Sequence, residues 1–129
     1  MVAAIAGAIA FATLPLSFQS FWILRVARDD SGAHGDLSVL TNAAFLFLGI
    51  GAVIGFTVAA TRMRPMRAAL FGSVFGLVLS LVAMTINWSE VNEVTAVANI
   101  VYYMVPGLCA GLASGWVSRV LGGSYRKTI

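Results

Sequence analysis

The chain has 129 residues, of which 60% are hydrophobic and 10% are charged, and its mean hydropathy is +0.93. This balance excludes an ordinary water-soluble domain, in which charged residues make up about a quarter of the chain. The net charge of +3 does not indicate nucleic acid as a partner, because the basic residues lie in small groups at the ends of apolar segments and form no basic face.

Four long apolar segments predict the fold. Crossing about 30 Å of hydrocarbon takes roughly 20 helical residues, and windows of this length occur at about residues 2–24, 37–61, 68–88 and 94–118. The connections between them are too short to hold a soluble domain. The sequence therefore predicts an all-α integral membrane protein in contact with membrane lipid: a four-transmembrane-helix bundle with short loops that forms a single domain over residues 1–129.

The first segment carries no charged residue, but its second half is polar. Pro15 removes a backbone hydrogen bond and is expected to kink the helix one turn before Gln19. Transporters often place substrate beside such a kink, although kinks also occur in helices that transport nothing.

The loop after the first segment has His34 among several aspartates, within Asp29–Asp36. It lacks the fixed spacing of a metal site, so we interpret it as a solvated surface loop. An enzyme that acts through this loop is a minor alternative.

Breaking residues separate the remaining segments. Pro65, in a cluster of three arginines, prevents the second and third segments from forming one helix. A short acidic turn with Glu90 and Glu93 separates the third segment from the fourth. Gly122 and Gly123 follow the fourth segment and are expected to end its helix.

The basic residues also predict the orientation, because Lys and Arg accumulate on the cytoplasmic side of a membrane. The cluster after the second segment and the C-terminal tail each carry three of them. The loop after the first segment carries two, diluted by aspartates, and the turn after the third carries none. This asymmetry predicts that both termini are cytoplasmic, and the Ala- and Gly-rich composition favours a bacterial inner membrane.

Small residues recur at four-residue spacing in every segment, which lets helix backbones approach closely within a membrane. We interpret this pattern as helix packing within the bundle or, alternatively, as an interface with a partner subunit or a second copy of the chain. The pattern comprises Ala4, Ala8 and Ala12 in the first segment, followed by Gly51, Gly55, Gly72, Gly76, Gly107, Gly111 and Gly115.

The polar residues of the segments are neutral. No Asp, Glu, Lys or Arg lies within the four segments, which argues against a proton-coupled carrier. Neutral groups such as Ser114 are expected to hydrogen-bond between helices. The single cysteine, Cys109, allows no disulfide within the chain, and the sequence predicts no catalytic, metal or cofactor site.

Two functional hypotheses remain. The first is a non-catalytic accessory or structural subunit that packs against a larger membrane protein complex, with other integral membrane subunits as its partners. The alternative is a homo-oligomeric channel or transporter for a small neutral or weakly polar solute. Its pathway would be lined by Gln19, Asn42, Asn99 and the glycine faces.

Overall fold

The computed structural model describes the backbone of residues 1–29, 36–86 and 88–126, and within them the side chains of 1–18, 41–86, 88–89 and 91–122. This part of the chain forms α1 (Val2–Asp29), α2 (Asp36–Thr61), α3 (Pro65–Ile86), a short 3-10 turn η1 (Trp88–Glu90) and α4 (Glu93–Arg126). The predicted all-α architecture with four helices is therefore confirmed.

Within the part of the chain whose side chains are described, three helical segments are long and apolar enough to cross a membrane: Thr41–Thr61, Pro65–Ile86 and Glu93–Gly122. The described side chains of α1 contribute a shorter apolar segment, Val2–Phe18. Large apolar side chains are exposed along all four helices, an arrangement that is stable in lipid but costly in water. These features indicate an integral membrane protein.

One predicted boundary is wrong. Helix α4 continues through Gly122 to Arg126 instead of ending at the glycine pair. No described glycine adopts a positive φ, so Gly122 does not form the left-handed cap that a glycine after a helix commonly provides. A glycine within a helix costs about 1 kcal/mol, which a long helix tolerates.

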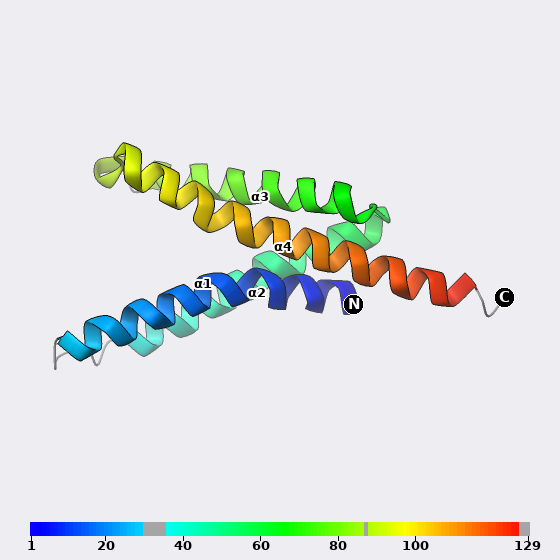
Figure 1. Ribbon diagram of the computed structural model, residues 1–129, viewed down its shortest axis with the longest axis horizontal. Coiled ribbons are helices and arrows are strands. Elements are labelled where there is room, and N and C mark those ends of the chain that lie inside the picture. The colour runs from blue at the N-terminus through cyan, green and yellow to red at the C-terminus, as the bar shows by residue number, and fades with distance from the viewer. Residues whose placement is uncertain (30–35, 87, 127–129) are drawn as a thin grey trace.

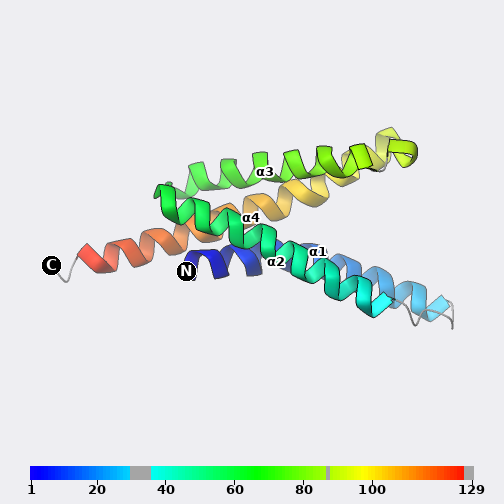
Figure 2. The same cartoon turned by 180° about the vertical axis from the view of Figure 1, so that it is seen from behind.

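The helices form two antiparallel hairpins, α1 with α2 and α3 with α4 (Figure 1). The hairpins cross and then diverge into two separated tips: the end of α1 and the start of α2 lie at one tip, and η1 with the start of α4 lies at the other (Figures 1 and 2). The start of α1 and the end of α4 lie on the opposite side, together with the α2–α3 turn. Helix α4 contacts the other three helices, whereas α2 and α3 barely touch. The molecule is thus a splayed bundle.

The core lies where the hairpins cross. It draws residues from all four helices: Phe11, Ala12, Phe47, Ile54, Val58, Ala68 and Ala110. Beyond this crossing, the diverging tips share no buried core among the described residues. The bundle is therefore held together at one level, and its tips are left apart.

The turn between α3 and α4 is fixed by a reciprocal cap. The Asn92 side chain accepts a hydrogen bond from the Thr95 backbone N–H (2.9 Å), and the Thr95 hydroxyl accepts one from the Asn92 N–H (2.8 Å). Such caps satisfy backbone groups that a helix N-terminus leaves without partners. They fix the start of α4, which forms one wall of the site described next.

Candidate functional site

Glycines bring α3 and α4 into direct backbone contact. A side chain at Gly72 would overlap the backbone of Gly107, and one at Gly107 would overlap Gly72. Further along, Gly76 lies against Tyr103, Gly111 against Ala68 and Gly115 against Pro65. Without a hydrophobic effect to separate helix from lipid, such close packing holds a membrane hairpin together.

The α1–α2 hairpin is closed in the same way. Gly51 packs against the backbone of Gly7 and Ala8, and Gly55 packs against Ala3 and Ala4. The seven glycines of the predicted pattern therefore all lie against helices of their own chain. Because these faces are already filled, a partner has to use a different surface.

The two hairpins are joined where Gly7 meets α4. A Cβ at Gly7 would lie 2.7 Å from Ser114 Oγ and 3.1 Å from Gly55 Cα. The buried Ser114 hydroxyl donates a hydrogen bond to the carbonyl of Ala3 (3.1 Å), which links α4 to α1. Gly7, Ala3 and Ser114 thus form the junction between the hairpins.

We expect Ser114→Ala to lower the free energy of unfolding by only about 0.6 kcal/mol, the average value of an interhelical side-chain hydrogen bond in a membrane. The carbonyl of Ala3 lies within α1 and keeps its helical partner. Reversible unfolding in mixed micelles, followed by circular dichroism, measures the change. A loss above about 2 kcal/mol would show that the hydroxyl does more than link two packed helices.

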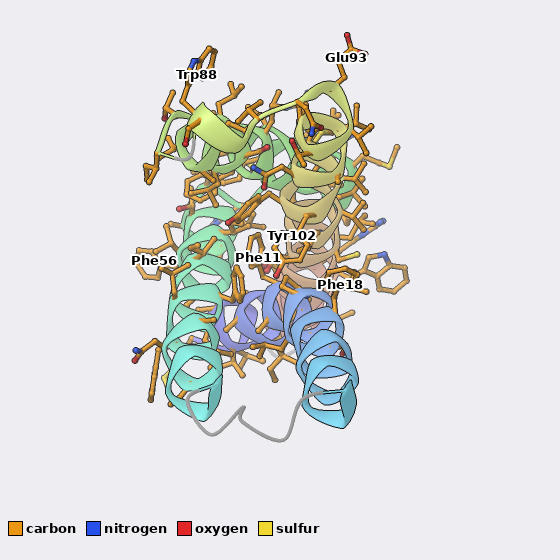
Figure 3. All side chains as sticks on the ribbon, turned by 90° about the vertical axis from the view of Figure 1, so that its left-hand side faces the viewer. Phe11, Phe18, Phe56, Trp88, Glu93 and Tyr102 are labelled. Carbon is orange, nitrogen blue, oxygen red and sulfur yellow. The ribbon has the colours of Figure 1, made fainter. Side chains whose placement is uncertain are left out.

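Beyond the junction, an open groove of about 370 Å³ lies between α1 and the α3–α4 hairpin. We call it the inter-hairpin groove. Phe18 of α1 and Met84 of α3 line it. The other lining residues come from the turn between α3 and α4 and from α4 itself: Val91, Thr95, Ala98, Asn99 and Tyr102. Phe18 of α1 and Tyr102 of α4 lie next to each other at the groove (Figure 3).

Aromatic rings close the inner end of the groove. The Tyr102 ring lies 6.0 Å from the ring of Phe18 and 6.2 Å from that of Phe47, both edge to face. Phe47 in turn packs on Phe11 at 6.2 Å. Each such contact stabilises the fold by about 0.5–1.5 kcal/mol beyond the contribution of the apolar area that it buries. The groove therefore ends against the core.

Among the described residues that line the groove, three have polar side chains: Thr95, Asn99 and Tyr102. The Thr95 hydroxyl takes part in the cap at the start of α4, and Tyr102 belongs to the aromatic cluster. Asn99 is half-buried, and among the described residues no hydrogen bond to its amide is present. A polar group exposed to hydrocarbon without a partner is costly, so this amide favours an occupant that can bond to it.

The predicted pathway residues do not come together in one cavity. Asn99 lines the groove, whereas Asn42 is exposed on α2 and lies outside its lining. The side chain of Gln19 lies outside the described residues, as do His34 and the rest of segment 30–35 in the predicted surface loop. The described chain thus contributes one of the three predicted polar groups to the groove.

Sequence patterns do not indicate the other groove residues. Phe18, Met84, Val91 and Ala98 are apolar residues in apolar segments, and hydropathy does not distinguish a groove wall from a face in contact with lipid. Only the position of Thr95 three residues after Asn92 offered a signal, as a capping pair.

No protein family, curated protein or solved structure matches this chain.

Proposed function

We propose that this chain is a non-catalytic subunit of a larger membrane protein complex, and that its inter-hairpin groove receives a transmembrane helix of a partner protein. In this proposal all four helices span the membrane and both termini lie in the cytoplasm. The observation that carries the proposal is the groove itself, an open site between two hairpins that meet at only one level.

The shape of the groove favours a docked helix over a transported solute. A solute pathway has to reach both sides of the membrane. Here the groove ends at the rings of Tyr102, Phe47 and Phe11, and the glycine faces that a pathway would use are filled by neighbouring helices. The channel or transporter hypothesis therefore has less support from this geometry.

The chemistry of the groove favours protein over a lipid chain. An acyl chain can fill apolar space but cannot hydrogen-bond to the Asn99 amide, whereas a partner helix offers polar side chains or carbonyls. Such bonds between membrane helices contribute about 0.6 kcal/mol on average. Ala98 beside Asn99 also allows a partner backbone to approach closely, as small residues do at helix interfaces.

Photo-crosslinking in the native membrane tests this assignment. A photoreactive phenylalanine analogue replaces Phe18, which lines the groove and is 59% exposed. The matched control replaces Phe56, which is 67% exposed and points away from the groove on α2 (Figure 3). We expect one discrete protein adduct from position 18 and none from position 56.

A groove-filling variant sharpens the test. Ala98→Trp is expected to abolish the adduct from position 18, because the indole occupies the partner's place, whereas Ala60→Trp at an exposed alanine of α2 is expected to leave it intact. An adduct of two copies of this chain, or equal crosslinking from positions 18 and 56, would contradict the proposal.

A further inference from the structure

The charges of the protein are segregated along its length. Arg62, Arg64 and Arg67 surround the α2–α3 turn, and Arg119 lies near the C-terminal end of α4; all four side chains are exposed. We call this set the basic end. Every acidic residue within the described elements lies at the separated tips instead: Asp29, Asp36, Glu90 and Glu93. No acidic side chain of the described chain is therefore placed to neutralise the basic end.

The α2–α3 turn is firmly held, which fixes its arginines at the surface. Arg62 takes a left-handed conformation (φ 50°), and its N–H donates to the carbonyl of Ala59 at 3.3 Å. The N–H of Met63 donates to the carbonyl of Val58 at 3.2 Å, and the half-buried Met63 side chain packs on the core. The left-handed region costs a non-glycine residue about 1–2 kcal/mol, and these contacts offset that cost.

Helix packing brings Arg119 to the same level. Gly115 of α4 lies directly against Pro65, the first residue of α3. Arg119 follows Gly115 by one helical turn, about 6 Å along the axis, and Arg64 immediately precedes Pro65. Arg64 and Arg119 therefore lie at a similar level of the bundle, and both side chains are exposed.

Exposed apolar side chains flank these arginines. Met66 is 76% exposed beside the turn, and Trp116, one turn before Arg119, is 64% exposed. Tryptophan favours the boundary between headgroups and hydrocarbon. The partner of the basic end thus has to present negative charge directly beside apolar material.

We propose that the basic end binds the headgroups of anionic phospholipids, and that Arg64 and Arg119 both contact phosphates of the same membrane leaflet. Arginine forks match phosphate oxygens in a bidentate manner, and Trp116 and Met66 lie in the adjoining acyl region. The assignment rests on charge complementarity and apolar flanks, and it does not depend on what occupies the inter-hairpin groove.

Lipid titration of the purified full chain in mild detergent tests the proposal, with phosphatidylglycerol, phosphatidylcholine and inorganic phosphate as the three probes. Each basic residue near an anionic surface contributes about a fivefold gain in affinity. We therefore expect the double variant Arg64→Gln/Arg119→Gln to bind phosphatidylglycerol about thirtyfold more weakly. The matched control Arg25→Gln/Arg28→Gln removes the same charge from α1 and is expected to retain the wild-type affinity.

Two further measurements support the interpretation if the double variant folds poorly. Arg64→Lys/Arg119→Lys keeps the charge and is expected to bind more tightly than the glutamine variant. Raising the salt from about 0.1 to about 1 M shortens the screening length from about 10 to about 3 Å and should weaken wild-type binding. Equal loss in both glutamine variants, equal binding of phosphatidylcholine, or inorganic phosphate binding as tight as the lipid would overturn the proposal.

Discussion

Gly72→Val is expected to lower the free energy of unfolding by about 3 kcal/mol, at the upper end of the range for overpacked sites. A Cβ at position 72 would overlap the carbonyl of Gly107, and a backbone atom cannot move aside as a flexible side chain can. The α3 and α4 helices then have to separate along their whole contact, so that many weak van der Waals contacts between them are lost together. Reversible unfolding in mixed micelles, followed by circular dichroism, measures the loss.

The chain offers a matched control for this change. Gly49 lies in α2, and an added Cβ there meets nothing within 4 Å. Gly49→Val should therefore leave stability within about 0.5 kcal/mol of the wild type, as surface substitutions usually do. If both variants lost the same stability, valine in a helix rather than the α3–α4 contact would be responsible, and the close packing described above would be wrong.

Gly7→Val is expected to be at least as damaging, because it acts on two interfaces. A side chain at position 7 would overlap the carbonyl of Gly51 in α2 and crowd the Ser114 hydroxyl of α4. The substitution should therefore open the α1–α2 hairpin and detach it from α4 together. We expect a loss of about 3 kcal/mol or more, together with a wider separation of α1 and α4.

Spin labels on α1 and α4 can detect that separation. Ile9 and Val105 are exposed positions on these helices, and Cys109→Ser removes the native thiol. The distance distribution between the labels should broaden and lengthen with Gly7→Val and stay unchanged with Gly49→Val. An unchanged distribution in the Gly7 variant would show that the hairpins are joined elsewhere.

The helices were predictable because hydropathy and helix-breaking residues act locally. Pro65 separates α2 from α3 as expected, and it occupies the first position of α3, where its missing N–H costs nothing. The helices are longer than the predicted membrane spans: α1 extends to Asp29 and α4 to Arg126, whereas those spans stop at about 24 and 118. Hydropathy marks where lipid contact ends, whereas a helix continues as long as its backbone hydrogen bonds do.

The glycine spacing indicated close packing but not which helices would pair. Only the structure shows Gly72 against Gly107, and Gly51 against Gly7, so that the faces are filled within one chain. Gly7 itself lay outside the predicted pattern, which counted the alanines at positions 4, 8 and 12 on its helix. Spacing gives the face of one helix, and the partner of that face depends on tertiary packing.

The groove could not be predicted, because it results from the divergence of the hairpins. Phe18 and Tyr102 lie far apart in the sequence and meet only through the crossing at the core. Asn99 was selected as a polar group within an apolar segment, and it does line the groove. Asn42 was selected for the same reason and is exposed on α2, so polarity alone does not identify a site.

A second membrane protein is proposed to complete this splayed bundle. Native mass spectrometry of the complex, released from its membrane in mild detergent, tests it most directly. We expect one copy of the 13.6 kDa chain bound to a different integral membrane protein, and loss of that species with Ala98→Trp. A spectrum that contains only the free chain or whole multiples of its mass would contradict the account.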